Sequence, residues 1–590
     1  MPSFRSAAVP VVLVAASIGA GLTVTGQQAV ATTLAAQSPV RGGVLNVLAL
    51  GDTDWLDPNI TYYSVGYTFA RQFSRQLYSL PARPGHTTDT VPDLATGMPR
   101  ISNNGQTYRI TIRKGARWDT AQARQVTAAD VVRGVKTTCN PYQPFGGLPD
   151  FENLLAGFAT FCRGFARVQP TAAAIKHYTE THSFAGVQAS TQNARTVVFH
   201  LTHRASYFTD MLTLPAFSPR PKEMLAYAPG SIGDVKHTIS DGPYRVSSYQ
   251  PGQRLVFVRN PAWNRATDPV RKGYVDKIVI TMNSATAPAV SKIRSGSQSA
   301  DVYLGSIDYP DAAKFKANHD RRLSVIPSIT SNPYILFNCA SPNNNSALQQ
   351  TNVRQAVAYA LDRADILSAI GNRQFSPGLT HVLPPKILGS QQFNPYPHDV
   401  SKANAMLQAT GQTNMTLTLL YPQIYTATSR VFQAVKRELS QVGITVVGKA
   451  VPPADFYTKY LQNPSTAQAG DWDLTVAGWG PDWYGNAALS FFGPLYDGRS
   501  LPPASSNFGL FNDPAVNQLI DEGARATTSQ SAGIWHRADV AVMNDAPVYP
   551  LSDPRIPLYR ATQVHNAVGV QMFGGFDLTN IWLDPAKNGG

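Results

Sequence analysis

The chain has 590 residues, too many for one compact core, because single domains commonly settle near about 100–200 residues. Its apolar share of 43% and charged share of 15% are those of a globular protein and argue against long disordered tracts. The net charge of +13 would suit nucleic acid, but Lys and Arg are scattered, without a basic run or an aromatic-interleaved basic stripe. We expect a basic solvated surface near an anionic envelope and no nucleic-acid partner.

Residues 1–31 predict an export signal. Arg5 gives a short positive start, residues 7–24 are apolar and small, and cleavage is expected after Ala31. A permanent membrane anchor is the alternative, but polar residues interrupt the stretch, which is short for a span of about 20 residues. We therefore expect an exported, extracellular or cell-envelope protein that is soluble after signal removal. No Cys precedes Cys139, so no lipid-anchoring cysteine is expected, and how the protein is retained at a membrane stays open.

The three cysteines are Cys139, Cys162 and Cys339. Disulfides persist in exported proteins, and a Cys139–Cys162 bridge would close a loop of about 23 positions and contribute about 3 kcal/mol. We predict this disulfide, with three buried thiols as the alternative. The spacings fit no zinc or haem attachment pattern, and the histidines form no pair at ligand spacing on a predicted helix. We expect no metal site and no cofactor.

The first half is predicted to be a mixed region with more strands than helices. Residues 43–50 form a short apolar strand, and residues 64–80 carry apolar side chains at helical spacing. Thr127, with an acidic residue three positions later, begins a helix in the manner of a capping box. Residues 139–195 are irregular and rich in Gly and Pro, which predicts a loop-dominated subdomain. Further strands are expected at 108–113, 197–201, 244–249, 255–258 and 275–282.

The second half changes to an alternation of strands and helices. Residues 353–361 show one apolar helical face. A strand, a helix and a strand are expected at 415–421, 430–442 and 444–451, which together predict a parallel unit. Gly443 ends the helix. A further apolar strand is expected at 472–477.

The loop after residues 472–477 is the candidate ligand site. Ligands of open α/β sheets settle beyond the carboxyl ends of strands, where loops converge. This loop offers glycines for close backbone approach, indoles for flat contact area and a carboxylate that can hold an amine. These residues are Gly478, Trp479, Gly480, Asp482 and Trp483. The alternative is that Asp482 caps a turn and that the tryptophans belong to the core.

Ordered motifs along the mature chain resemble a known family. They are Leu56-Asp57-Pro58, Pro92-Asp93-Leu94-Ala95, residues 105–108, 112–118 and 126–131, Asp241-Gly242-Pro243-Tyr244, and residues 259–263, 353–356 and 360–363. Each motif is weak alone, but the set keeps the family's order over nearly all of the mature chain. The chain resembles the extracellular solute-binding proteins of peptide, dipeptide and nickel import, also called family 5.

The resemblance implies an α/β, bilobal, periplasmic-binding-protein-like (Venus flytrap) fold. It has a large first lobe with two subdomains, a second α/β lobe and two hinge crossings, which we expect near residues 331–337 and 545–552. The expected parts are lobe 1 subdomain a at 32–88 and 215–331, subdomain b at 89–214, lobe 2 at 332–548, and a return to lobe 1 at 549–590.

The resemblance also implies a non-catalytic function, as the monomeric substrate-binding component of an ATP-driven (ABC) importer. Such a receptor captures oligopeptides or dipeptides between its lobes and delivers them to the permease and ATPase subunits at the membrane. A receptor for a metal chelate or haem on the same fold and a surface chaperone-like binder are the alternatives. Catalysis has little support, because no G-x-S-x-G elbow, H-E-x-x-H motif or phosphate-cradling loop occurs.

Peptide binders of this family hold the ligand's α-amine with an aspartate that follows a Gly-Trp pair, a pattern that Asp482 matches here. The sequence departs from the pattern at Pro481 and at residues 484–486, so peptide length and side-chain preference are left unassigned. Tyr62 and Tyr63 correspond to a first-lobe stretch that often pairs with the peptide backbone. No residue is assigned to the ligand's carboxylate.

Overall fold

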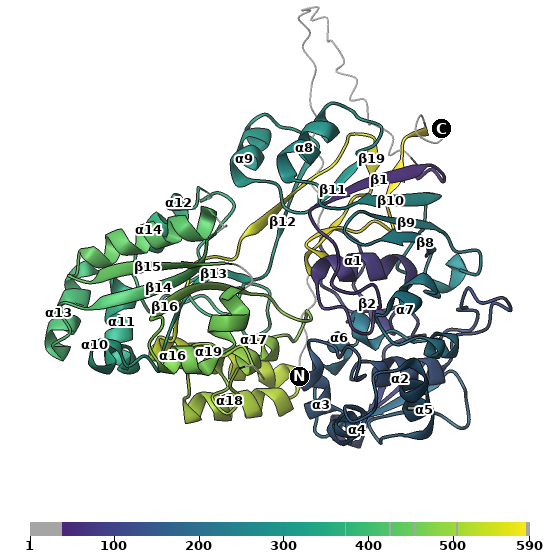
Figure 1. Ribbon diagram of the computed structural model, residues 1–590, viewed down its shortest axis with the longest axis horizontal. Helices are drawn as coiled ribbons and strands as arrows, with labels where there is room; N and C mark the ends of the chain where they lie inside the picture. The colour runs from purple at the N-terminus through teal and green to yellow at the C-terminus, as the bar shows by residue number, and fades with distance from the viewer. Residues whose placement is uncertain (1–37, 372, 424–425, 453–454, 503–504, 586–590) are drawn as a thin grey trace, which may run out of the picture. The chain divides into compact units, whose positions relative to one another are not determined.

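The computed structural model describes residues 38–371, 373–423, 426–452, 455–502 and 505–585 (Figure 1). The predicted export signal at residues 1–31 lies outside this part of the chain. The chain divides into Met1–Pro39 and a compact unit Val40–Gly590, which carries every helix and strand described below. No helix in the described ranges is both long and apolar enough to cross a membrane.

The first lobe is built on a five-stranded sheet with the order β11-β1-β10-β9-β8 (Figure 1). Its strands are β1 (Val44–Ala49), β8 (Tyr244–Gln250), β9 (Arg254–Arg259), β10 (Lys277–Thr281) and β11 (Val302–Leu304). Strand β1 runs parallel to β10 and β11, and β8, β9 and β10 pair antiparallel. Helices α1 (Ser64–Phe73), α8 (Thr286–Arg294) and α9 (Tyr309–Ala317) contribute buried side chains to the same core.

Helix α1 is shorter than the apolar spacing over residues 64–80 predicts. It ends at Phe73, and Ser74 is already extended. The next residues run beside β3 (Val91–Pro92) and its continuation, with the amide of Asp93 donating to Leu77. The buried Arg75 guanidinium also donates to Asp93. The prediction of a helix was wrong beyond Phe73, because backbone hydrogen bonds to residues 93–95 take the place of another helical turn.

The second subdomain of the first lobe has a four-stranded sheet, β4-β5-β7-β6, and four helices. They are β4 (Arg100–Ser102), β5 (Thr107–Thr111), β6 (Val187–Ala189), β7 (Thr196–His200), α2 (Ala128–Thr137), α3 (Leu148–Leu154), α4 (Phe158–Phe165) and α5 (Ala172–Thr181). The capping box at Thr127 is present. The expectation of a loop-dominated region at 139–195 was wrong. Its short helices bury Phe151, Phe161 and Ile175, and each helix is too short for this spacing to stand out in the sequence.

The Cys139–Cys162 disulfide is confirmed and joins the end of α2 to α4. Replacing both cysteines with serine is expected to lower the free energy of unfolding by about 3 kcal/mol, because the unfolded chain gains freedom that the closed loop had removed. Thermal unfolding checks this: reductant should lower the wild-type midpoint and leave that of the double variant unchanged. Cys339→Ser, which keeps the bridge, is the control, and a reductant-insensitive wild type would contradict the prediction.

The second lobe is built on a sheet with the order β15-β14-β16-β13-β17 (Figure 1). Its strands are β13 (Ser331–Phe337), β14 (Thr416–Pro422), β15 (Thr445–Val451), β16 (Leu474–Trp479) and β17 (Val548–Pro550). Its longer helices are α11 (Thr351–Ala360), α12 (Arg363–Ala369), α13 (Val400–Thr410), α14 (Thr426–Ser440), α17 (Leu489–Tyr496), α18 (Pro514–Arg525) and α19 (Thr528–Asp545).

The predicted strand–helix–strand unit of this lobe is confirmed. Strands β14 and β15 pair in parallel along their whole length, and α14 connects them and packs on both. Gly443 ends the turn after α14 with a φ of 76°. A Cβ at this position would lie 2.8 Å from the Thr413 carbonyl oxygen, so a side chain would be both strained and crowded.

The chain passes between the two lobes twice. It leaves β12 (Leu323–Pro327) of the first lobe and enters β13, and it leaves β17 and enters β18 (Arg555–Tyr559), which pairs antiparallel with β12. Both connections are short, residues 328–330 and 551–554. The segments expected as crossings, 331–337 and 545–552, largely form β13 and β17. The connections between the two lobes therefore lie directly beside the expected segments. The domain boundaries stay a prediction.

Several short strands and α-helices lie between these elements. They are β2 (Tyr78–Ser79), α6 (Phe208–Met211), α7 (Ile232–Lys236), α10 (Asn343–Ser346), α16 (Pro464–Gln468), β19 (Val564–His565), β20 (Gly569–Val570), β21 (Gly575–Phe576) and β22 (Trp582–Leu583). The C-terminal strands β20 and β21 pair with each other. They return Val570 to Gly575 to the neighbourhood of α1, where Arg71 lies over the ring of Phe573.

Candidate functional site: a cleft between the lobes

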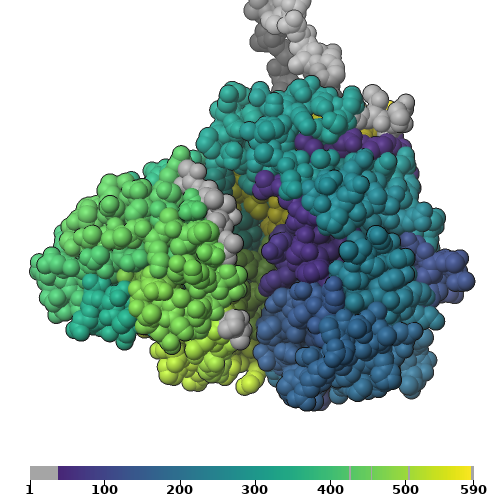
Figure 2. Space-filling model, in the orientation of Figure 1, coloured from purple at the N-terminus to yellow at the C-terminus, as the bar shows by residue number. Residues whose placement is uncertain are grey.

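A cavity of about 560 Å³ lies between the lobes. The space-filling view shows the furrow between the purple surface of the first lobe and the green surface of the second (Figure 2). Its lining comes from α1 and the loop before it, the start of α9, both crossings with the adjoining strand ends, the end of β16 with the loop after it, and the C-terminal return. Representative residues are Tyr62, Tyr67, Thr330, Asn332, Gly478–Asp482, Arg555, Gln571 and Met572. The volume is that of sites for drug-sized ligands, about 300–1,000 Å³.

The end of β16 sets one wall of the cavity. Gly478 packs closely on β13, the strand that follows the first crossing, since a Cβ at Gly478 would lie 2.5 Å from the Asn332 side-chain oxygen. Trp479 is half-buried, and its indole N–H donates to the Ser490 carbonyl at 2.7 Å, which fixes the ring at the cavity wall. The glycine therefore permits the approach of a neighbouring strand, and the indole supplies flat surface to the cavity.

Asp482 presents its carboxylate to the cavity from the loop after β16. The Tyr62 hydroxyl, from the first lobe, donates to Asp482 Oδ1 at 2.6 Å, so this bond joins the two lobes. Burial raises the pKa of Asp482 to about 6, and the Tyr62 hydrogen bond opposes that rise. Within the described residues no Lys, Arg or His forms an ion pair with Asp482. The carboxylate is thus desolvated but not neutralised by a cation.

The structure brings together five of the seven predicted ligand-binding residues: Tyr62, Gly478, Trp479, Gly480 and Asp482 all line the cavity. Two others do not line it. Tyr63 precedes the first turn of α1 with 60% of its surface exposed. Trp483 is fully buried, donates to the Asn486 carbonyl and stacks on Tyr207 with ring centroids 5.6 Å apart. The alternative of a core tryptophan therefore describes Trp483.

The lobes also touch outside the cavity lining, where the loop after Trp483 meets α6. The backbone N–H of Asn486 donates to the Asp210 carboxylate, and the side-chain amide of Asn486 donates to the Ser206 hydroxyl at 2.9 Å. The Ser206 hydroxyl donates in turn to the Ala526 carbonyl. With the Tyr62–Asp482 bond, these contacts hold one side of the cleft closed.

Sequence reasoning missed several cavity residues, among them Tyr67, Asn332, Arg555 and Gln571. Helical spacing places Tyr67 on the buried face of α1, but nothing in that spacing shows that its ring reaches a cavity. Asn332 and Arg555 lie on the crossing strands. The register of β13 with β16 places Asn332, and that of β12 with β18 places Arg555, at the cavity that Asp482 also lines.

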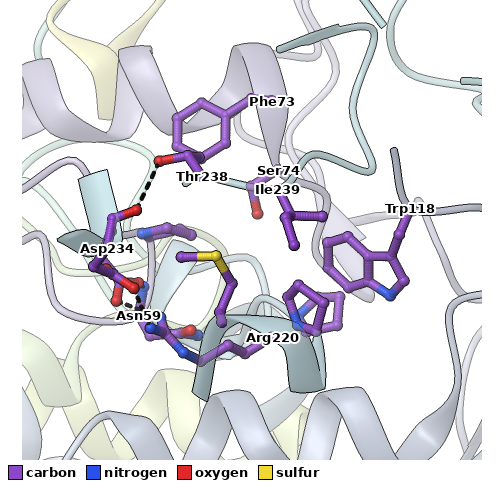
Figure 3. A pocket seen from close by; sticks show the side chains of 13 residues that line it. Asn59, Phe73, Ser74, Trp118, Arg220, Asp234, Thr238 and Ile239 are labelled. Carbon is purple, nitrogen blue, oxygen red and sulfur yellow. Dashed lines mark hydrogen bonds and ion pairs between the residues drawn. The ribbon is translucent and has the colours of Figure 1, made fainter. Parts of the chain in front are cut away.

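A separate cavity inside the first lobe is small, about 30 Å³, which is room for a water or two. Figure 3 shows Arg220, Asn59 and Asp234 on one side of it and Trp118 on the other. The Arg220 guanidinium donates to Asp57 and Asp234, each at 2.5 Å, and all three side chains are nearly inaccessible to solvent. The cavity is too small for a solute, so we assign the ion triad a structural role.

Two lobes, two crossings and a ligand-sized cavity between them define a bilobal solute receptor. The chain belongs to the bacterial extracellular solute-binding proteins, family 5, whose middle-region model matches residues 89–500. The predicted family and the α/β bilobal fold are thereby confirmed. The family is defined by solute binding, which agrees with the non-catalytic interpretation at that level.

Relatives and solved structures extend this similarity. The chain is 23% identical to heme-binding protein A of Haemophilus influenzae, over 81% of this chain and 82% of that one. It is 22% identical to the periplasmic oligopeptide-binding protein OppA of Salmonella typhimurium, over 75% and 76%. The solved clavulanic acid biosynthesis oligopeptide binding protein 2 is 26% identical, with a TM-score of 0.80 over 92% of this chain and 96% of that one. DppA of Helicobacter pylori, solved with the peptide STSA, has a TM-score of 0.67 at 18% identity, over 92% and 98%.

Proposed function

We propose that this protein is the substrate-binding component of an ABC importer and captures short peptides in the cleft between its lobes. The observation that carries the proposal is the Asp482 carboxylate, which faces a ligand-sized cavity without a cationic partner in the described chain. The names of OppA and of the solved oligopeptide binding protein support a peptide ligand. The partners are a membrane permease and its ATPase subunits, and the receptor acts as an exported monomer.

Binding starts at the ligand's α-amine. The amine donates to Asp482, a charge-assisted hydrogen bond that contributes roughly 1.5–3 kcal/mol, and Trp479 packs against the first residues of the peptide. Exposed backbone groups of the cleft pair with the peptide backbone, which tolerates different side chains. Because the lining comes from both lobes and both crossings, a bound ligand stabilises the closed arrangement through a hinge motion at residues 328–330 and 551–554.

Mass spectrometry of ligand that co-purifies with the natively expressed protein tests this function, followed by calorimetric titration with the peptides it identifies. The proposal expects short peptides with a free amine. Exclusive recovery of a non-peptide ligand, with no heat of binding from any short peptide, would contradict it.

The affinity for a peptide is expected to depend on pH through Asp482. Its pKa of about 6 means that protonation below pH 6 removes the charge that holds the amine, so affinity falls as pH decreases from 7 to 5. Tyr62→Phe removes a hydrogen bond that favours the ionised form and should move this loss to higher pH. Calorimetry from pH 5 to 7 measures both effects, with Asp482→Asn as the variant that should lack the acid-side loss. An affinity independent of pH in the wild type would contradict the assignment.

Binding of haem or a metal chelate is the second candidate, favoured by the similarity to heme-binding protein A. The described residues contain no group of three or more His, Cys, Asp or Glu arranged to hold a metal ion, so a metal would have to arrive as a complex. Titration with hemin, followed by its absorbance band, separates the two candidates. Saturable binding of hemin that short peptides cannot displace would favour this second function.

A further inference from the structure

A hollow of about 450 Å³ lies in lobe 2 and shares no lining residue with the interlobe cleft. It is bounded by the start of α12, by the segment that follows α12, by residues shortly before α13 and by β17. The volume falls within the range of about 300–1,000 Å³ that is usual for small-molecule sites. Its wall combines apolar side chains with two arginines: Leu367, Pro377, Pro397, Tyr549, Arg363 and Arg373.

Arg363, the first residue of α12, is held at this hollow without a counterion. Its Nε donates to the Pro550 carbonyl at 2.8 Å, and its guanidinium carbon lies 4.4 Å from the centroid of the Tyr549 ring. Its buried Nη2 has no hydrogen-bond acceptor, and no described carboxylate forms an ion pair with it. Burial lowers the pKa of Arg363, yet an arginine stays charged in a protein. The cation is therefore desolvated without a bonded anion.

The carboxylates nearby are either engaged or uncharged. Asp362 offsets the Arg363 charge through space, but one of its oxygens accepts from two backbone N–H groups of α12 and the other lies 3.7 Å from His398 Nδ1. Glu438 accepts from the Asp362 N–H, and burial raises the pKa of Glu438 to about 9, so it is uncharged at neutral pH. Neither group bonds to the Arg363 guanidinium.

Arg373 adds a second positive charge to the hollow. It is exposed, and it makes no hydrogen bond or ion pair with any residue in the described ranges. A guanidinium presents its N–H donors in a planar fork that matches the oxygens of a carboxylate or a phosphate. Two such forks at one ligand-sized hollow are suited to an oxyanion.

We propose that this hollow binds a small organic anion, whose carboxylate or phosphate oxygens accept from Arg363 and Arg373 and whose apolar body packs against Pro377 and Pro397. A bound oxyanion supplies the counterion that Arg363 lacks, and the apolar wall favours an organic anion over an inorganic one. The site is separate from the interlobe cleft, so it stands or falls independently of the proposed peptide binding.

The hollow adjoins the second crossing between the lobes. Residues 375–379 run beside this crossing, and the Leu379 N–H donates to the Leu551 carbonyl at 3.0 Å. Arg363 itself donates to Pro550, the last residue of β17 before the crossing. An anion on Arg363 would thus contact the side chain that anchors the lobe-2 end of the hinge.

The test uses three aromatic probes of similar size: phenyl phosphate, benzoate and the uncharged benzyl alcohol. Calorimetry measures each probe against the full-length wild type and three variants. At least one anion should bind the wild type, and benzyl alcohol should not. Arg363→Gln should weaken anion binding roughly 10- to 100-fold, the value of a charge-assisted hydrogen bond. Arg373→Gln removes an exposed charge and should weaken it about two- to fivefold. Arg537 is exposed and already bonded to Glu522, so Arg537→Gln should behave as the wild type.

The two anions distinguish the possible ligands. Binding of phenyl phosphate alone identifies an organic phosphate, and binding of benzoate alone identifies an organic carboxylate. If neither anion binds the wild type at millimolar concentration, or if Arg363→Gln and Arg373→Gln both keep the wild-type affinity, the inference is overturned. It is also overturned if binding is lost in Arg555→Gln instead, because Arg555 lines the interlobe cleft.

Two further measurements guard against a misfolded variant. Circular dichroism and the thermal midpoint show whether Arg363→Gln is folded, and Arg363→Lys, which keeps the charge without the fork, should bind with intermediate affinity. A crystal structure of the wild type with the anion that binds needs no variant. An anion oxygen within about 2.7–3.2 Å of an Arg363 guanidinium nitrogen is expected, and an anion found only elsewhere would overturn the inference.

Discussion

Asp482→Ala is expected to weaken binding of a short peptide by roughly 100- to 1,000-fold or more. Removing one partner of a buried charge pair costs about 3–5 kcal/mol, because the other charge stays desolvated without compensation. In the bound state that other charge is the ligand's α-amine, which in the variant faces a cavity whose remaining lining charge is the cation Arg555. Calorimetric titration at pH 7 measures the loss.

Three controls accompany this experiment. Asp482→Asn keeps the size of the side chain and should lose nearly as much affinity as alanine. Asp471→Ala removes an exposed carboxylate that precedes β16 and should change nothing. The wild type titrated with the N-acetylated peptide should match Asp482→Ala titrated with the free one. Wild-type affinity in Asp482→Ala would remove this residue from the site.

Arg220→Met is expected to destabilise the first lobe by about 3–5 kcal/mol. The substitution leaves Asp57 and Asp234 buried side by side without the cation that both now contact. Burial already raises the pKa of Asp234 to about 7 with Arg220 present. In the variant protonation relieves the repulsion of the two carboxylates, so the loss should be smaller at pH 5 than at pH 8. Urea denaturation followed by circular dichroism at both pH values measures it.

An exposed ion pair of the second lobe provides the control for Arg220. Arg537 donates to Glu522, with 60% and 41% of the two side chains exposed, and such pairs contribute at most about 1 kcal/mol. Arg537→Met should therefore shift the denaturation midpoint only slightly. If Arg220→Met shifts it as little as Arg537→Met does, the triad beside the small cavity does not stabilise the first lobe.

The parts of the fold that were predicted correctly are those in which local pattern and tertiary environment agree. Strand β5 alternates buried and exposed residues, as its sequence does. The unit from β14 to β15 is marked by an amphipathic helix and by Gly443, whose positive φ is needed at the turn. The helix predicted over residues 76–80 was wrong, because these residues pair with residues 91–95 despite their helical spacing. The helices of 139–195 were not predicted, because each has only 7 to 10 residues, too few for a helical period to stand out in an irregular sequence.

The candidate site could be predicted only in part. The rule that ligands meet loops at the carboxyl ends of strands led to Gly478, Trp479 and Asp482, which all line the cavity. It could not separate the two tryptophans, because the burial of Trp483 depends on Tyr207 of the other lobe. It could not find Arg555 either, since a cation on a return strand has no local signature of ligand contact.

A crystal structure of the protein with a short peptide in the cleft tests the central claim most directly. The account predicts the peptide's α-amine nitrogen within about 2.7–3.2 Å of an Asp482 carboxylate oxygen, with the ligand enclosed by both lobes. A peptide bound elsewhere, or one whose amine points to solvent while Asp482 stays bonded to Tyr62 alone, would contradict it.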